Sequence, residues 1–307
     1  PHDGNIFMDK VPAGAYVANG YGKLMGITQI EELGNLETPI VLTNTLSVPT
    51  AADAVLDYIL GLQGNENIGS VNTVVGETND GYLNDIRGRH VKKEHVLEAI
   101  NKSASGPVPE GALGAGTGTV CFRYKGGIGT SSRKLPSSQG GYTVGVLVQT
   151  NFGGILQING MPLDETANDL EDKNKSPEEN EEGSCMIIVA TDAPLDSRNL
   201  KRLAKRSLLG IARTGGYYSN GSGDYAVAFS TAQGLRIKHH SRDTTRKIEI
   251  LRNDRTSPLF LAAAEAAEEA ILNSLFKAEE MKGRDGHLIK SLPLDLIRNK
   301  LQGKKTK

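Results

Sequence analysis

Alternating runs of apolar and polar positions divide the chain into predicted strands and helices. Short β-branched or apolar runs predict strands, whereas apolar residues three or four positions apart predict helices. The strands are expected at residues 38–46, 70–86 (running into a polar turn), 118–132, 141–153, 185–194 and 224–232. The helices are expected at residues 50–60, 92–102, 197–214 and 257–276, followed by a frayed lysine-rich end. Strands and helices alternate without an internal repeat, which indicates the α/β class.

The boundaries of three helices can be predicted from cap signals. Thr50 and Ser197 are expected as N-caps, and Pro258 fits the first turn of the last helix. The helix expected at residues 197–214 should stop at Gly215 and carry a basic face. That face could be a phosphate or nucleic-acid patch or simply a solvated surface, and the lack of interleaved aromatic residues favours the solvated surface. Its members are Lys201, Arg202, Lys205 and Arg206.

The composition changes sharply between residues 164 and 182. This segment holds nine acidic residues, two lysines, one proline and a single large aliphatic residue. Such a segment cannot bury enough apolar surface to offset its ordering entropy, so we expect a disordered acidic linker. It ends at Gly183, and the strand that follows has almost no polar face, as expected for a strand covered on both sides.

Composition excludes several classes of partner. The 307 residues carry a formal net charge of −1 with a pI of about 6.7, so no overall field draws the chain to nucleic acid or a membrane. No apolar run approaches the ~20 residues of a membrane helix. Cys121 and Cys185 lie among apolar neighbours and are expected to be small buried side chains, which favours a cytoplasmic location. The opening residues, 1–3, lack an initiator Met, so we expect a piece of a longer chain.

Common catalytic motifs are absent from the sequence. The glycine-rich stretches at residues 114–118 and 126–130 fit neither a P-loop nor a dinucleotide fingerprint. The six histidines have no metal-ligand spacing, so no metal site is expected. No G-x-S-x-G run marks a hydrolase elbow. A hydrolase built on this chain would need a serine that does not depend on a histidine.

The junction of Gly183 and Ser184 offers such a serine. It is either an ordinary loop meeting a strand or a bond that the chain cuts, leaving Ser184 as a new N-terminus. Glycine tolerates the strained backbone that exposes a carbonyl to the next hydroxyl. After cleavage the α-amine of Ser184 could take the proton of its own hydroxyl.

Several long segments resemble the DmpA-type aminopeptidase family (peptidase family P1, with L-aminopeptidase D-Ala-esterase/amidase, β-peptidyl aminopeptidase and nylon-oligomer hydrolase relatives). They occur in the family's order and cover most of residues 38–232, although the family's usual opening segment is missing. The matching segments are VVGETNDGYLNDIRGRHV, EGALGAGTGTVCFRYKGGIGTSSR, YTVGVLVQTNFG, GSCMIIVATDAPLDSRNLKRLAKRSLLGIARTGG and NGSGDYAVAFSTA.

The resemblance implies a four-layer αββα sandwich of the self-processing N-terminal-nucleophile type. The larger subunit would be residues 1–183 and the smaller one 184–307, intertwined in one structural domain. It also implies cofactor-free hydrolysis of peptides, amides or esters with release of an N-terminal amino acid, and a tetramer of processed pairs. The alternative is an unprocessed, inactive homologue that binds a small ligand or serves in assembly.

The resemblance also assigns the site residues. Ser184 falls on the nucleophile, Ser222 and Asp224 on the pair that orients it, and Asn151 on an oxyanion donor. Glu77 falls where a carboxylate could receive the substrate ammonium, and Lys125 heads a turn near the site.

Each assignment has a plainer alternative, and two positions depart from the family pattern. Asn151 could only cap a strand end, Ser222 and Asp224 could be turn residues, and Lys125 and Glu77 could be exposed charges. Asn79 stands where well-known members place a tyrosine that helps the oxyanion, and asparagine can also donate there, but from a shorter side chain. Asp224 stands where many members carry the longer glutamate. Cys185 is expected to point to the strand face opposite Ser184.

Overall fold

The computed structural model describes residues 1–163 and 183–302. Its main sheet has seven strands in the order β14-β1-β13-β12-β9-β8, with β3 paired to β1. β12 pairs parallel with β13 and antiparallel with β9, while β1 pairs antiparallel with β13. The strands are β1 (Asp9–Gly20), β3 (Asn35–Leu36), β8 (Ile128–Lys134), β9 (Thr143–Asn151), β12 (Ser184–Thr191), β13 (Gly223–Ser230) and β14 (Ile237–Lys238).

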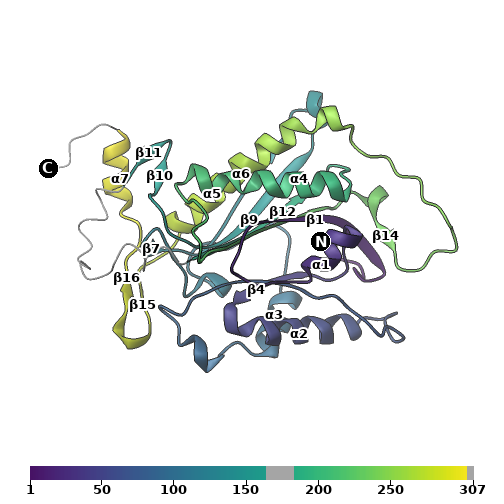
Figure 1. Ribbon diagram of the computed structural model, residues 1–307, viewed down its shortest axis with the longest axis horizontal. Coiled ribbons are helices and arrows are strands. Elements are labelled where there is room, and N and C mark those ends of the chain that lie inside the picture. Colours follow the sequence, from purple (N-terminus) through teal and green to yellow (C-terminus); the bar gives the residue numbers. More distant parts are fainter. Residues whose placement is uncertain (164–182, 303–307) are drawn as a thin grey trace.

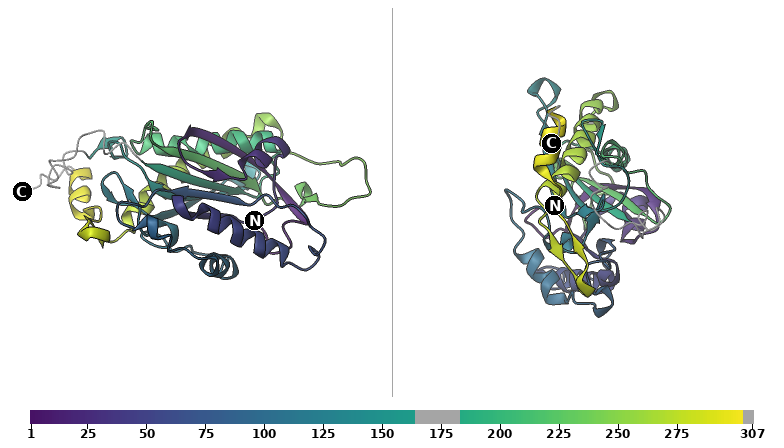
Figure 2. Two further views of the ribbon diagram at one scale, coloured as in Figure 1. Left: turned by 60° about the horizontal axis from the view of Figure 1, so that its bottom comes forward. Right: turned by 90° about the vertical axis from the view of Figure 1, so that its left-hand side faces the viewer.

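A second sheet and two helical layers complete the molecule (Figures 1 and 2). The second sheet runs β2-β5-β4, formed by Leu24–Met25, Val74–Thr78 and Ile40–Asn44. Helices α4 (Ser197–Ser207), α5 (Leu209–Arg213) and α6 (Ser257–Phe276) lie on the outer side of the main sheet, and α2 (Val48–Leu60) and α3 (Lys93–Asn101) lie on the outer side of the second. The layers follow the order helix, sheet, sheet, helix, as the family resemblance implies.

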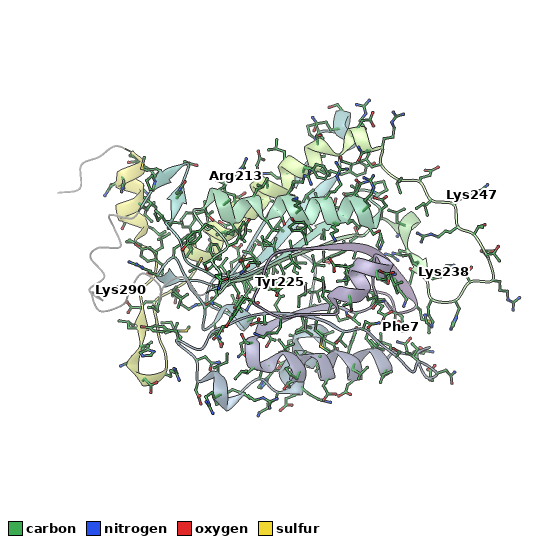
Figure 3. All side chains as sticks on the ribbon, in the orientation of Figure 1. Phe7, Arg213, Tyr225, Lys238, Lys247 and Lys290 are labelled. Carbon is green, nitrogen blue, oxygen red and sulfur yellow. The ribbon has the colours of Figure 1, made fainter. Side chains whose placement is uncertain are left out.

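Three apolar cores separate these layers. The first joins α4 and α6 to the main sheet through Cys185, Ile187 and Val189. The second fills the space between the sheets and includes Met186 and Tyr225, and Figure 3 shows Tyr225 in the middle of the molecule. The third lies between the second sheet and α2. Because alternate residues of β12 enter different cores, this strand is covered on both faces, as its apolar sequence predicts.

Two predicted N-caps were wrong by one to three residues. The N-cap of α4 is Asp196, whose carboxylate accepts from the Asn199 amide at 2.9 Å, so Ser197 is the first helical residue. α2 begins at Val48 after Ser47, because Pro49 fits the first helical turn better than a position before the helix. Pro258 occupies the first turn of α6 as predicted.

The strand predicted at residues 118–132 is interrupted. Residues Phe122 and Arg123 have φ angles of 50° and 66°, and they form the turn between β6 (Val120–Cys121) and β7 (Tyr124–Lys125). Two consecutive left-handed residues suit a tight hairpin, but neither is a residue type that signals one.

The predicted frayed, lysine-rich end falls on residues 303–307, which lie outside the described residues, and ordered elements precede it. A hairpin of β15 (Met281–Lys282) and β16 (Leu288–Ile289) is followed by α7 (Leu294–Leu301), and Leu292 and Ile297 are buried in the first core. The remaining short elements are α1 (Ile27–Leu33), β10 (Gln157–Ile158) and β11 (Met161–Pro162). Within the described ranges, no helix is long and apolar enough to span a bilayer. The predicted acidic linker, residues 164–182, lies outside the described residues.

Candidate active site

Ser184 is the first residue of β12, and its hydroxyl lies against the peptide bond that precedes it. Ser184 Oγ donates to the carbonyl oxygen of Gly183 at 2.7 Å. The backbone amide of Gly223, the parallel partner of Ser184, donates to the same carbonyl oxygen at 3.1 Å and lies 3.2 Å from Ser184 Oγ. A hydroxyl, the carbonyl beside it and a backbone donor are therefore held together by the register of two parallel strands.

Strand alternation separates Ser184 from Cys185. Cys185 is fully buried in the core beneath the outer helices, whereas the next residue along, Met186, enters the core between the sheets. Ser184 shares the face of Met186. Burial raises the pKa of Cys185 well above its usual value, so its thiol stays neutral. The prediction that Cys185 points away from the face of Ser184 is confirmed.

The backbone around the Gly183–Ser184 bond leaves no room for side chains. A Cβ at Gly183 would lie 2.5 Å from the carbonyl oxygen of Asn151 and 2.5 Å from the Cα of Phe152. A Cβ at Gly223 would lie 2.5 Å from the Cα of Gly22. These approaches require glycine and bring three chain segments against one peptide bond.

Asn151 stands directly across the sheet from Ser184. The two residues are antiparallel partners, so both side chains project on the same face of the sheet. Asn151 Oδ1 accepts from the Val120 amide at 2.9 Å, and Nδ2 donates to the Asn79 carbonyl at 3.0 Å. Because one end of the amide accepts and the other donates, its orientation is fixed, and Nδ2 keeps a second hydrogen for another acceptor.

Glu77, on β5, is a buried carboxylate near Gly22, which lies beside the start of β13. It is 2% exposed, which excludes the exposed-charge alternative. Oε1 accepts from the Lys23 backbone amide at 2.8 Å, and Oε2 accepts a hydrogen bond from Thr45 Oγ1. Both donors are neutral. The Oε1 atom also lies 3.1 Å from where a Cβ of Gly22 would be, and Gly22 in turn contacts Gly223.

Asp224 lies on β13, the strand next to Ser184, but on the other face, and Ser222 is in the turn just before that strand. Asp224 pairs with Cys185. Because side chains alternate along a strand, Asp224 faces the same side as Ala226, which lies in the core beneath the outer helices. Burial raises the pKa of Asp224 to about 6, against smaller opposing effects of the nearby Ser222 hydroxyl and Cys185 amide. Among the described residues, neither Asp224 oxygen nor Ser222 Oγ has a hydrogen-bond partner of normal geometry. In the uncut chain these two residues are thus not joined to Ser184.

Lys125 is fully buried, not an exposed charge. Its Nζ donates to the carbonyls of Gly116, Thr119 and Gly126 at 2.7–2.9 Å, and burial lowers its pKa to about 8. All of these partners are backbone groups, so Lys125 organises the glycine-rich turn. The Asn79 side chain is exposed and accepts from the Gly81 amide at 2.9 Å, whereas the hydrogen bond with Asn151 uses the Asn79 backbone carbonyl.

Sequence reasoning missed three groups that build this site. The Gly223 amide carries no residue-type signal because it is a backbone donor. Thr45 follows β4, and its contact with Glu77 depends on the parallel pairing of β4 with β5. Asn19 Nδ2 donates to the carbonyls of Ser219 and Ser222 and so holds the turn before β13. Only the arrangement of strands distant in sequence reveals these contacts.

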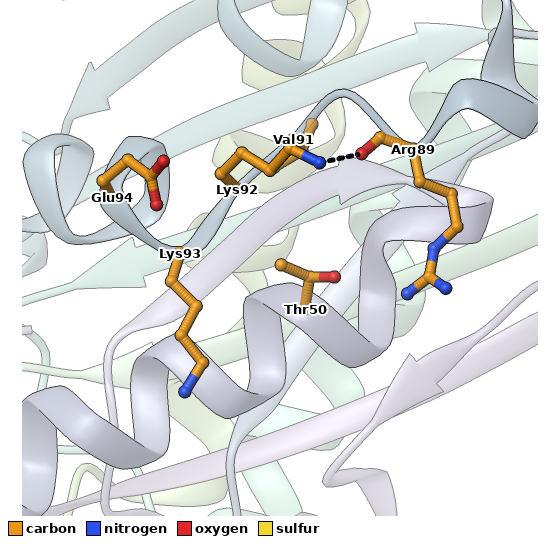
Figure 4. A pocket seen from close by; sticks show the side chains of 6 residues that line it. All are labelled: Thr50, Arg89, Val91, Lys92, Lys93 and Glu94. Carbon is orange, nitrogen blue, oxygen red and sulfur yellow. Dashed lines mark hydrogen bonds between the residues drawn. The ribbon is translucent and has the colours of Figure 1, made fainter.

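A separate cavity lies on the opposite side of the second sheet (Figure 4). Its lining includes Lys92 and Lys93 but none of the candidate site residues. Lys93 is paired with Asp53 and Asp57 at 2.6 Å each, and Lys92 donates to the Arg89 carbonyl at 3.3 Å. The positive charge of this cavity is therefore partly neutralised, and Ser184 is not among its described lining residues.

Comparisons with known proteins show the family and the fold of the chain. The model of peptidase family S58 matches residues 1–289. The β-peptidyl aminopeptidase BapA of Sphingosinicella microcystinivorans is 41% identical over 296 residues, which span 92% of this chain and 74% of that protein. A crystal structure of a protein from Pyrococcus horikoshii OT3 matches with a TM-score of 0.88 and 51% identity, covering 99% of this chain and 84% of that one.

A further structural match describes the fold by name. The L-aminopeptidase D-Ala-esterase/amidase of Ochrobactrum anthropi, described as a new variant among the Ntn hydrolase fold, has a TM-score of 0.87 and 34% identity. It covers 97% of this chain and 83% of its own. The predictions of the DmpA-type family, of the hydrolase class and of the N-terminal-nucleophile fold are confirmed. The chain therefore belongs to peptidase family S58 and has the fold of an N-terminal-nucleophile hydrolase.

Proposed function

We propose that the chain cuts itself between Gly183 and Ser184 and then acts as an N-terminal-serine aminopeptidase that also hydrolyses amides and esters. The observation that carries this proposal is the contact of Ser184 Oγ with the Gly183 carbonyl, with the Gly223 amide aimed at both. The names of the relatives, a β-peptidyl aminopeptidase and an L-aminopeptidase D-Ala-esterase/amidase, support the substrate class.

Self-cleavage begins with attack of Ser184 Oγ on the carbonyl carbon of Gly183. The hydroxyl proton passes to the Ser184 nitrogen as the C–N bond breaks, which leaves an ester and a free α-amine. Water then hydrolyses the ester to the Gly183 carboxylate and the free hydroxyl. The Gly223 amide stabilises the oxyanion of the first step, because it already donates to that carbonyl oxygen.

The same hydroxyl then attacks substrates. The α-amine of Ser184, with an ordinary pKa of about 7.7–8.0, takes the hydroxyl proton at neutral pH. The free Nδ2 hydrogen of Asn151 stabilises the substrate oxyanion. Asn79 supports it through its backbone carbonyl instead of its side chain.

Glu77 receives the ammonium of the residue to be released. Its carboxylate is buried and held by two neutral donors, so a substrate cation would complete its partners. This requirement makes the enzyme an exopeptidase that needs a free amine. Lys125 supports the site indirectly by ordering the turn that ends at Gly126.

Ser222 and Asp224 are proposed to orient the new terminus after cleavage. Both are buried next to the strand start with unused hydrogen-bonding atoms. Release of the chain at Ser184 would let the terminal residue shift toward them, which the intact peptide bond prevents.

The larger and smaller subunits are proposed as residues 1–183 and 184–307, assembled as a tetramer of pairs in the cytoplasm. The family resemblance supports the assembly, and light scattering of the processed protein would test it. Two buried, unpaired cysteines support a reducing compartment.

The intact mass of the purified protein under denaturing conditions tests the central proposal. Two fragments are expected, the smaller beginning at Ser184, and Ser184→Ala should give one mass. Cys185→Ala is the matched control. The Cys185 thiol lies in a different core from the Ser184 side chain, so this variant should cut itself normally. A wild-type chain that stays whole for days at neutral pH would overturn the mechanism.

A further inference from the structure

The amide oxygen and the amide nitrogen of Asn151 are hydrogen-bonded to two segments, and residues 281–290 contact both of these segments. Oδ1 is bound by Val120 in the β6–β7 hairpin, and Nδ2 is bound to the Asn79 carbonyl in the loop after β5. These two segments come from different parts of the sequence. Their shared neighbour is the stretch 281–290, here named the C-terminal strap, which contains β15 and β16.

The strap contacts the loop after β5 through ring stacking and two hydrogen bonds. The rings of His287 and Tyr82 stack with centroids 4.4 Å apart and planes 13° apart. His287 Nδ1 lies 2.7 Å from the Tyr82 carbonyl, so that nitrogen must carry the proton. The Arg284 amide donates to the Leu83 carbonyl at 2.8 Å.

Close packing makes this contact specific. A Cβ at Gly283 would lie 2.1 Å from the Leu83 carbonyl oxygen, so only glycine lets the two backbones approach. Leu83 itself is buried, and its amide closes a turn onto the Asp80 carbonyl at 3.2 Å. The turn begins at the residue after Asn79, so the strap fixes the loop that carries the Asn79 carbonyl.

The strap also contacts the other holder of Asn151. The Lys125 amide donates to the Lys290 carbonyl at 2.9 Å, and Lys125 is the strand partner of Val120. Figure 3 shows Lys290 at the base of the hairpin. The strap thus reaches the acceptor of Nδ2 through Tyr82 and Leu83, and the donor to Oδ1 through Lys125.

We infer that the C-terminal strap, with His287 as its main positioning residue, sets the orientation of the Asn151 amide for oxyanion stabilisation. This inference rests on the proposed function of Asn151. After cleavage the strap belongs to the smaller subunit and Asn151 to the larger one. The smaller subunit then supplies the nucleophile and also aligns the oxyanion donor of its partner fragment.

The experiment compares His287→Ala with Leu288→Ala, a control at a residue of the same hairpin that is 47% exposed. His287→Ala should lower kcat about tenfold with KM within about twofold, since displacements of an ångström cost up to about 10²-fold. Leu288→Ala should match the wild type. His287→Phe keeps a ring for stacking but loses the Nδ1 hydrogen bond, and an intermediate kcat is expected.

A double-mutant cycle separates positioning from a general structural role. If His287 acts through Asn151, His287→Ala should change kcat less than about twofold in an Asn151→Ala background. The same tenfold loss in both backgrounds, or no loss in either, would overturn the inference. A wild-type chain that neither cuts itself nor hydrolyses substrates would instead overturn the proposed function, and this inference with it.

Discussion

The Gly223 amide donates to the Gly183 carbonyl oxygen at 3.1 Å, across two parallel strands that begin side by side. An oxyanion formed at Gly183 would already have a donor before any bond breaks. Because the donor is part of the sheet backbone, it cannot reorient as a side chain does. The rate of self-cleavage should therefore depend on strand register more than on any single side chain.

Gly183→Ala should slow self-cleavage without removing the nucleophile. The added Cβ would lie 2.5 Å from the Asn151 carbonyl oxygen and from the Phe152 Cα, so the Gly183–Ser184 bond must shift away from β9 and lose its present alignment with the Gly223 amide. We expect the half-time of processing, followed by denaturing gel, to rise at least about tenfold. Gly234→Ala is a suitable control because nothing lies within 4 Å of its Cβ position. Equal processing by the two variants would contradict this account.

Asn151→Ala should lower kcat by about 10²–10³-fold with a small effect on KM. Loss of one oxyanion donor has this cost in other hydrolases, because the donor acts mainly in the transition state. Steady-state kinetics on an amino-acid anilide would measure it. The exposed Asn67→Ala should behave as wild type. A rise in KM alone would show that Asn151 binds substrate and does not stabilise the oxyanion.

Glu77→Gln should weaken recognition of a free amine. The substitution keeps the shape and the acceptor for the Lys23 amide but removes the charge. We expect kcat/KM for a substrate with a free amine to fall about 10- to 100-fold, since hydrogen bonds to charged groups contribute about 1.5–3 kcal/mol. The des-amino analogue of the same anilide serves as the control. A matching fall for that analogue would exclude ammonium binding by Glu77.

The raised pKa of Asp224 predicts a pH dependence of the uncut chain. The folded-state pKa of Asp224 is about 6, above its unfolded value. The contribution of Asp224 to the free energy of unfolding is therefore full below about pH 3.9 and is lost as the pH rises through 6. In a Ser184→Ala background, unfolding free energy should fall by about 3 kcal/mol across this range from this group.

Urea unfolding at several pH values would measure that slope. Asp224→Asn should remove the contribution of Asp224, whereas Asp80→Asn should remove a separate contribution of the same sign and keep that of Asp224, since burial also raises the pKa of Asp80. An unchanged slope in Asp224→Asn would mean that the carboxyl group is solvated in the folded chain.

The sequence predicts the layers and the scissile bond, but not the contacts that set their geometry. A polar segment that meets an apolar strand marks Ser184, and alternation alone places Cys185 on the other face. The turn at Phe122 and Arg123 was missed because neither residue is typical of left-handed conformations. The stack of Tyr82 on His287 joins residues 205 positions apart, which no local pattern can reveal.

The order of strands in the main sheet has a consequence for the cut protein. β12 and β13 would belong to the smaller fragment, yet they lie between β9 and β1, which belong to the larger one. Each fragment would therefore be hydrogen-bonded to the other along both outer edges of a two-strand insert. Separation would require opening the β1–β13 and β9–β12 ladders together with the short β1–β14 ladder, so a cut chain would stay interlocked. The precursor would fold as one chain, whereas refolding after denaturation would require the two fragments to associate.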